Sequence, residues 1–401
     1  MKNLFKLLFI LLVASFFSID ANATGEASTY FQIFVPPNAD NSSRRANLVI
    51  TAIYDNTTFT IIDDGMDGDT DDSVTGTLMA GQSYILYIKD NGVNDDKGGT
   101  HDGDYFIVTS SNLVFASQST DSDWQHDWVP ATNKTSKGQR FLIYAPEKSS
   151  SNRDLNVYAY DDSTTVTIKA IHTVLKTTTG YTTVEVDSGI VVGQRTLNIG
   201  EDIIFKYNEG KNVMESGGTY LVESNKPITV QYGALSGNAR DGGGYVPSDN
   251  GSSSGDLFYF TVHTQASREQ EVRIVSWDAS NNVSLDYYDN GNWINIDSWT
   301  LDDLDPGDWV SNSGNINKVF RVTCSAGKKV SVFEANWLET GSPGTSDVAS
   351  MMSGRNGTAA GTEFLAYMAP PGNEGNVINP FTGTNDLTKS THLYIFAKDS
   401  A

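Results

Sequence analysis

The chain has 401 residues, with 36 glycines, 18 tyrosines, 18 phenylalanines, a single cysteine and a formal net charge of −22. The acidic balance argues against nucleic acid and anionic lipid as partners, because phosphate binding needs clustered lysine and arginine. A single cysteine cannot form an internal disulfide. No stretch after the N-terminus carries a sustained helical hydrophobic period, so the sequence favours β-structure.

The N-terminus has the features of a secretory signal peptide. Lys2 and Lys6 precede an apolar run at residues 7–17, and Ala21 and Ala23 form a small-x-small cleavage site. Residues 1–23 are therefore expected to be removed on export, and the protein is expected to be secreted or held at the cell surface. No later apolar run approaches the roughly 20 residues that a membrane helix needs, so no membrane insertion is expected.

Beyond the signal peptide the sequence repeats one pattern of β-structure with a spacing of about 110 residues. Each copy opens with an aromatic-rich strand, and these strands begin at Phe31, Phe141, Leu257 and Phe364. A predicted hairpin follows, in which alternating β-branched residues flank a polar turn of Asp, Asn or Ser. These hairpins occupy residues 48–62, 155–168 and 272–285.

Two further segments complete the pattern. A Thr-Leu strand end followed by a polar turn begins at Thr77, Thr196 and Thr300. A second predicted hairpin then closes the copy, and its clearest example, GGTYLVESNKPITVQYGA, begins at Gly217. Pro227 in this segment is expected at the start of a strand, where a missing N–H is tolerated.

The pattern divides the chain after residue 23 into successive domains. We expect β repeats at residues 24–138, 139–254 and 255–361, and the start of a truncated fourth repeat at 362–401. The last segment stops inside its first predicted hairpin turn, and a hairpin strand needs a partner for its backbone groups. The protein is therefore expected to continue past Ala401.

The fold class predicted from these repeats is all-β, built from repeats of antiparallel hairpins. Each repeat has room for about seven or eight short strands, and two packings accommodate them. In one, each repeat forms two blades of a β-propeller-like array. In the other, the repeats are tandem β-sandwiches. The short polar connections between the repeats favour the propeller-like array.

The order of these motifs resembles the N-terminal domain of IgGFc-binding protein and of the bacterial secreted proteins that carry the same domain. The resemblance covers nearly all of the mature chain and rests on GTYLVESNKPITVQYG, on the Val129-Pro130 and Val246-Pro247 loops and on the F-x-x-x-A-P strands. The third repeat departs from it, with DVASMMSGRNGTAAG in place of a Val-Pro loop. The resemblance implies a secreted or surface protein with a binding or adhesion role, while immunoglobulin binding belongs to the animal member alone.

The acidic segment DDGMDGDTDDS, at residues 63–73, contains a candidate metal site. Asp67, Asp69 and Asp71 have the alternate spacing that places three carboxylates around one Ca²⁺ in calcium loops. The segment is not an EF-hand, because Leu78 stands where the closing Glu is expected. The alternative interpretation is a solvated acidic loop that holds no ion.

Four aromatic residues outside the strand pattern are candidates for ligand binding on a shared rim of loops: Trp124, Trp128, Tyr245 and Trp337. They follow the second predicted hairpin at equivalent places in three repeats, and loops at the rim of a rigid scaffold often carry function. The alternative is that they act as wedge residues between neighbouring repeats.

The sequence contains no convincing catalytic motif. Residues 251–255 match G-x-S-x-G, but the nucleophile elbow needs a following helix and here a new strand is expected. The five histidines form no metal-binding pair. Cys324 lies in an apolar strand pattern, so we interpret it as a small core residue and not as a reactive thiol.

These observations lead to three hypotheses for the function. The first is a non-enzymatic extracellular binding or adhesion module that presents loops to a protein or glycan partner. The second is a secreted carbohydrate-active enzyme that uses paired Asp residues as acid and base. The third is a structural spacer of a large surface protein. No cofactor is indicated apart from the Ca²⁺ considered above.

Overall fold

The computed structural model describes residues 27–35, 46–63, 73–87, 104–120, 126–129, 137–145, 154–177, 180–184, 190–205, 218–233, 243–246, 248–249, 254–261, 269–310, 318–337 and 350–351. Within these ranges the chain forms 23 β-strands and no helix, and the strands pair antiparallel. This confirms the all-β antiparallel fold class predicted from the sequence. The signal peptide at 1–23 and the fourth repeat at 362–401 lie outside the described residues.

The first seven strands form one sheet system, which we call the first unit. Its strands are β1 (Ser28–Val35), β2 (Ala46–Ala52), β3 (Thr57–Asp63), β4 (Ser73–Leu78), β5 (Ser83–Tyr87), β6 (Asp104–Thr120) and β7 (His126–Val129). The first part of the long strand β6 pairs with β1 and β3, and its second part pairs with β2 and β7. The unit thus has an opening sheet, β1-β6-β3-β4, and a closing sheet, β7-β6-β2-β5.

The second unit repeats this arrangement around another long strand, β14. Its strands are β8 (Lys137–Ala145), β9 (Asp154–Ala159), β10 (Thr164–Thr177), β11 (Gly180–Val184), β12 (Ile190–Leu197), β13 (Asp202–Phe205), β14 (Gly218–Gly233) and β15 (Gly243–Val246). The opening sheet is β8-β14-β10-β12 and the closing sheet is β15-β14-β9-β13. The additional strand β11 pairs with the far end of β10.

The third unit has two separate four-stranded sheets. Its strands are β16 (Leu257–Thr261), β17 (Glu269–Ser276), β18 (Asn281–Asp289), β19 (Asn292–Leu301), β20 (Pro306–Val310), β21 (Val319–Cys324), β22 (Val330–Trp337) and β23 (Ser350–Met351). The opening sheet is β16-β21-β18-β19, and the closing sheet is β20-β17-β22-β23. Here β21 and β22 take the places of the two parts of β6 and β14, so the same pairing order occurs three times.

The described strands lie at the residues predicted from the sequence, but two kinds of predicted hairpin do not form, because their strands pair differently. A tight turn joins β2 to β3, yet β2 pairs in the closing sheet and β3 in the opening sheet, so the connection is an arch between sheets. The segment that begins at Gly217 forms the single strand β14, which changes partners between Glu223 and Ile228. Antiparallel hairpins do recur, but β3–β4 and β18–β19 form them.

The arches are held in the same way in all three units. Each turn contains one non-glycine residue with positive φ: Asn56 (57°), Ser163 (54°) and Ser280 (52°). An N–H at the start of the strand that follows donates to a polar side chain in the segment that leads from the opening sheet to the closing sheet. These bonds are Thr58 N to Ser111 Oγ (3.0 Å), Thr165 N to Asn225 Oδ1 (2.7 Å) and Asn282 N to Ser325 Oγ (3.0 Å). Each arch is thereby tied to the segment that joins the two sheets.

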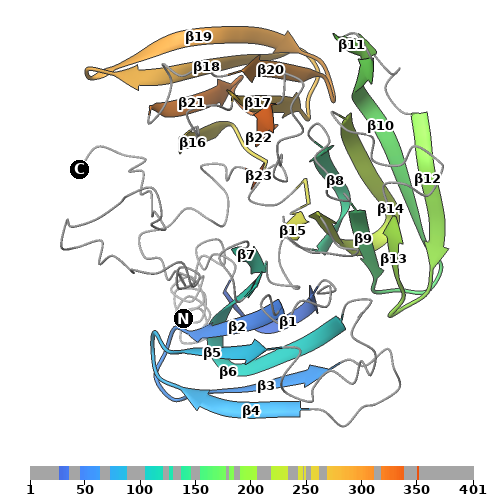
Figure 1. Ribbon diagram of the computed structural model, residues 1–401, viewed down its shortest axis with the longest axis vertical. Coiled ribbons are helices and arrows are strands. Elements are labelled where there is room, and N and C mark those ends of the chain that lie inside the picture. Colours follow the sequence, from blue (N-terminus) through green and yellow to red (C-terminus); the bar gives the residue numbers. More distant parts are fainter. Residues whose placement is uncertain are drawn as a thin grey trace, which may run out of the picture.

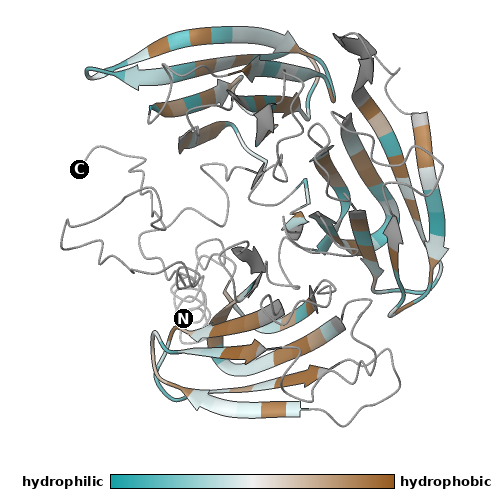
Figure 2. Ribbon diagram, viewed as in Figure 1, coloured by the Kyte–Doolittle hydropathy of each residue, from teal (hydrophilic) through white to brown (hydrophobic). Residues whose placement is uncertain are grey.

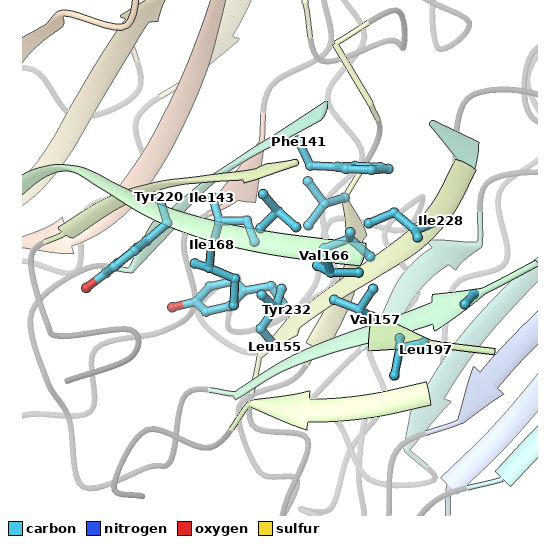
Figure 3. Packing of buried hydrophobic residues seen from close by; sticks show 14 of the residues in the cluster. Phe141, Ile143, Leu155, Val157, Val166, Ile168, Leu197, Tyr220, Ile228 and Tyr232 are labelled. Carbon is cyan, nitrogen blue, oxygen red and sulfur yellow. The ribbon is translucent and has the colours of Figure 1, made fainter. Parts of the chain in front are cut away.

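Each unit has its own hydrophobic core between its opening and closing sheets. Residues alternate along the strands, so that Phe31 and Ile33 of β1 point into the first core while Gln32 points outward, and Figure 2 shows this alternation of hydrophobic and hydrophilic residues. Figure 3 shows side chains from both sheets meeting in the second core, among them Phe141 and Val157. Each unit is therefore a two-sheet β-sandwich.

The three units follow one another around a common centre (Figure 1). In that view β7, β15 and β23 lie nearest the centre, and β4, β12 and β19 lie outermost. Each sheet is four strands wide, and the sheets are arranged around a common centre, as expected for a propeller-like array. Within each unit, however, two sheets pack face to face and are joined by a long strand or an arch, as in the alternative prediction of tandem β-sandwiches. The expected boundaries at 138, 254 and 361 stay predictions.

The turn between β12 and β13 provides a test of this backbone geometry. Gly200 has φ of 77°, and an added Cβ would meet no atom within 4 Å. We expect Gly200→Ala to lower the free energy of unfolding by about 1 kcal/mol, because a left-handed conformation strains any residue with a Cβ. Urea unfolding measures the change. Ile199→Ala, in the same exposed turn, is the control and should unfold like the unchanged protein.

Candidate functional site

The units meet face to face, with the opening sheet of one unit against the closing sheet of the next. In the first junction, Gln32 Nε2 donates to the Tyr158 hydroxyl over 3.2 Å, and Asn156 Nδ2 donates to the Tyr105 hydroxyl over 3.0 Å. The ring centres of Tyr105 and Tyr158 lie 4.7 Å apart. The first junction is thus built from tyrosine rings and amide hydrogen bonds that join the first unit to the second.

A small hollow lies in this first junction. Tyr105, Tyr160, Thr229 and Tyr245 are among the residues that line it. It has room for about one water molecule, whereas small-molecule sites enclose roughly 300 Å³ or more. Burial raises the pKa of Tyr105, and burial also raises the pKa of Asp202, although a hydrogen bond with Tyr105 opposes that second shift. We interpret the hollow as part of the contact between units, because no substrate would fit inside it.

The second junction contains a buried ion cluster, the Arg273 cluster, which consists of Tyr144, Thr219, Glu271, Arg273 and Asp308. The Arg273 side chain is only 1% exposed. Its Nε donates to Asp308 Oδ1 over 2.6 Å, its Nη1 donates to Thr219 Oγ1 over 3.0 Å, and its Nη2 lies 3.3 Å from Glu271 Oε1. The Tyr144 hydroxyl donates to the other oxygen of Glu271. Because Tyr144 and Thr219 belong to the second unit, the cluster ties the second unit to the third.

The titration behaviour of the Arg273 cluster follows from its burial. Burial raises the pKa of Glu271 to about 7, although the charge of Arg273 opposes the shift. Burial also raises the pKa of Tyr144, so its hydroxyl stays protonated and remains a donor. A shifted carboxyl can mark a catalytic site. In this cluster, however, one oxygen of Glu271 accepts a hydrogen bond from Tyr144 of the second unit, and the other lies in an ion pair with Arg273, which itself donates to Thr219 of the second unit.

Apolar side chains from both units also pack together in the second junction, next to Tyr144 of the Arg273 cluster. Leu142, Ile171 and Leu221 of the second unit pack with Val275 and Phe333 of the third. Leu304 packs against the same cluster.

The backbone of Leu304, in the turn between β19 and β20, is strained. Its φ is 67°, where the equivalent turns of the other units have Gly81 and Gly200. A bulky residue rarely adopts this conformation. The contact of the Leu304 side chain with the second junction explains why a leucine occupies a position that suits glycine.

The opening sheet of the third unit has an outer face that no other described unit covers. Tyr259, Arg321, Asp286 and Asn295 form one row across β16, β21, β18 and β19, because each is paired with the next. Tyr288 and Trp293 are paired in the adjacent row. Residues that pair across strands point to the same side of the sheet. We call these six residues the Trp293 face.

The polar part of the Trp293 face centres on Asp286. Arg321 donates to Asp286 Oδ2 from Nη2 over 2.6 Å and from Nε over 3.1 Å. Asn295 Nδ2 and Ser284 Oγ donate to Oδ1 over 3.1 and 3.0 Å. Burial alone would raise the pKa of Asp286, but the hydrogen bonds from Arg321, Asn295 and Ser284 pull it below its usual value. The carboxylate is therefore charged and fixed in place at neutral pH.

The aromatic part of the Trp293 face surrounds the indole ring. The Arg321 guanidinium lies 4.4 Å from the centre of the Trp293 ring, in a cation–π contact. The rings of Tyr259 and Tyr288 lie 5.7 and 5.2 Å from that of Trp293. Tyr288 is 47% exposed. The result is a rigid aromatic surface on a sheet, next to an ordered Arg–carboxylate pair.

The structure describes three of the four aromatic residues of the predicted rim, and their positions differ. Trp124 lies outside the described residues. Trp128 is on β7, where its backbone pairs with Ser117, and Trp337 is the last residue of β22. Tyr245 is 9% exposed and packs against the core of the first unit, although it belongs to the second. Tyr245 thus occupies the wedge position between repeats, which was the alternative to an exposed rim.

The predicted calcium ligands Asp67, Asp69 and Asp71 lie outside the described residues, so this site stays a prediction. In the part of the chain that the structure describes, no three His, Cys, Asp or Glu side chains gather to hold a metal ion. The same part contains no helix of the length and hydrophobicity needed to cross a membrane.

Cys324 lies half-buried at the edge of the third core, as expected for a small core residue. Its thiol contacts the Lys328 carbonyl at 3.2 Å, and burial raises its pKa to about 11. The thiol is therefore protonated at neutral pH and a poor nucleophile. Ser253, the central serine of the G-x-S-x-G match, lies outside the described residues.

Comparisons with known proteins leave the family open. No family model matches the sequence, and no curated protein matches it. Neither comparison bears on the resemblance to the N-terminal domain of IgGFc-binding protein. That resemblance therefore rests on the sequence motifs alone.

Sequence reasoning missed both the Arg273 cluster and the Trp293 face. Both contain an arginine in the middle of an apolar strand, in VRIVS and VFRVT. In an alternating strand the position of each arginine faces away from the core of its own unit. Alignment of the repeats could have revealed both sites, because Arg273 stands where the second repeat has Asn156, and Arg321 stands where it has Leu221.

The Arg273 cluster predicts a pH dependence of stability. Since the pKa of Glu271 rises from 4.5 to about 7 on folding, the folded state holds this proton more tightly than the unfolded chain. The contribution is complete below about pH 4.5, and about 3 kcal/mol is lost as pH rises through 7. We expect Glu271→Gln to remove this part of the slope in unfolding experiments between pH 4.5 and 8.

The matched control for this experiment is Glu223→Gln. Glu223 is paired with Lys169 at the surface, and its side chain is 30% exposed. This variant should keep the pH slope of the unchanged protein. An unaltered slope in Glu271→Gln would show that Glu271 does not bind a proton on folding.

Proposed function

We propose that the protein is a non-enzymatic extracellular binding or adhesion module with a protein or glycan partner. The observation that carries the proposal is the Trp293 face. Aromatic rings offer a large contact area at a low cost in conformational entropy. Arg321 and Asp286 add directional polar groups in a fixed geometry. The signal-peptide motif at 1–23 supports secretion or display at the cell surface.

The arrangement of the units supports the same proposal. We take the common pairing order as a sign that one module is repeated along the chain. The tyrosine–amide contacts and the Arg273 cluster hold adjacent units in fixed positions. A rigid scaffold helps a binding protein, because less conformational freedom is lost when the partner binds.

The second candidate is a secreted carbohydrate-active enzyme. It needs two carboxyl groups about 5 to 10 Å apart across a cleft. Glu271 has a raised pKa, but it is buried between Arg273 and Tyr144, which favours a structural role. The third candidate, a structural spacer, draws support from the rigid junctions and assigns no role to the Trp293 face. These comparisons favour the binding module.

The binding function predicts retention of a partner without turnover. The purified chain, residues 24–401, would be immobilised and exposed to arrays of glycans and extracellular proteins, with a heat-denatured sample as control. We expect the native chain to retain at least one partner and to release no product from a panel of chromogenic glycosides. Turnover would support the enzyme instead, and a chain that retains nothing would support the spacer.

Calcium binding by Asp67, Asp69 and Asp71 remains part of the proposal and has its own test. Closely spaced carboxylates repel one another unless a cation neutralises them, and an ion that binds only the folded state stabilises it. We expect a chelator to lower the Tm of the unchanged protein and to leave the Tm of a variant with all three residues changed to Asn unaltered. A constant Tm of the unchanged protein at several chelator concentrations would rule out a structural calcium site there.

A further inference from the structure

The chemistry of the Trp293 face suits one class of ligand, and we infer that this face binds a neutral carbohydrate chain. The inference rests on the proposed binding function and names the ligand class of the same surface. It depends on three properties of the face: it lacks the leucine pair that occupies the equivalent place in the second junction, it has an aromatic surface, and it carries polar groups with hydrogen-bonding capacity to spare.

The first property comes from a comparison of equivalent positions. In the second unit, Leu142 and Leu221 pair across the opening sheet and are buried against the third unit. In the third unit, Tyr259 and Arg321 form the equivalent pair. A charged side chain thus replaces a leucine that, one unit earlier, packs against the next sandwich. The face therefore lacks the apolar pair that is buried at the equivalent place in the second junction.

The second property is the aromatic surface. One side of a pyranose ring presents C–H groups, and this apolar side packs flat against aromatic rings. The Trp293 ring, on the edge strand β19, has its centre 5.2 Å from that of Tyr288 on the adjacent strand β18, at an interplanar angle of 60°. Its centre also lies 5.7 Å from that of Tyr259 on β16, at an angle of 41°. These side chains are held by strand pairing and not by a loop. The three tilted rings therefore form one fixed apolar surface against which the C–H side of a sugar ring can pack.

The third property is the supply of polar groups beside the rings. Arg321 uses Nε and Nη2 for Asp286, and within the described part of the chain its Nη1 makes no hydrogen bond. The hydroxyl groups of Tyr259 and Tyr288 also make none there. These groups can bind sugar hydroxyls, which act both as donors and as acceptors.

The charge of the face sets the kind of sugar. Arg321 and Asp286 form a bidentate pair, so together they carry no net charge at neutral pH. The chain as a whole carries −22, which repels uronic acid and sulfated chains at long range. A neutral chain of pyranoses avoids that repulsion and still uses both the rings and the polar groups. The geometry therefore favours a neutral polysaccharide over an acidic one.

Titration of the chain with soluble neutral polysaccharides tests the inference. Glucans, mannans, galactans and xylans would be added separately, with binding followed by tryptophan fluorescence and measured by calorimetry. We expect at least one class to bind, and Trp293→Ala to weaken that binding by at least about tenfold, because an aromatic contact is lost. Trp293→Phe keeps a ring and should lose less.

Controls separate loss of binding from loss of structure. Tyr54→Ala removes an aromatic side chain that is 54% exposed in the first unit, far from the Trp293 face, and should leave binding unchanged. Thermal melts of every variant show whether the fold is retained. Tyr288→Ala, at the most exposed ring of the face, provides a second variant if Trp293→Ala fails to fold, and it should also weaken binding.

The outcomes distinguish this inference from the function on which it rests. Polysaccharide binding that survives both Trp293→Ala and Tyr288→Ala would overturn the inference and leave the binding function intact. Binding to a protein alone would do the same. A dimer of the unchanged chain that Trp293→Ala dissociates would identify the face as a contact between copies and would also overturn it. A chain that binds no partner of any class would end both proposals.

Discussion

Every sheet in this protein has two faces, and the structure depends on how both are covered. One face of each sheet packs into the core of its own unit, where Phe31, Phe141 and Phe258 occupy equivalent places. The other face must pack against the next unit or meet solvent. Because successive side chains point to opposite faces, one strand contributes to both contacts, and the units stack in a fixed order around a centre (Figure 1).

The chemistry of the outward faces differs from one contact to the next, although the pairing order is the same. Tyrosine rings and amides fill the first junction, and a buried arginine with two carboxylates forms the second. Burying such ions is costly unless each is paired, which the Arg273 cluster achieves with side chains from both units. On the third outward face an arginine remains near the surface beside Trp293. These faces, and not the cores, distinguish the units.

The sequence predicted the strands well and their partners less well. Alternating residues around a polar turn indicate two strands, as at 48–62, but a hairpin and an arch between sheets share that signal. Only the packing of Ile50 and Ile61 from opposite sheets into one core decides between them. Tyr245 was expected on a rim because it follows a predicted hairpin, and it packs between units. Contacts across units depend on residues far apart in sequence, so Arg273 and Thr219 gave no local pattern.

The long strands β6 and β14 have a mechanical consequence. Each belongs to both sheets of its unit, so tension along the chain is opposed by hydrogen bonds in two sheets at once. The third unit lacks this continuity, because the turn at Ser325–Lys329 separates β21 from β22. Under tension along the chain, the third sandwich is therefore expected to yield first, while the first two stay intact.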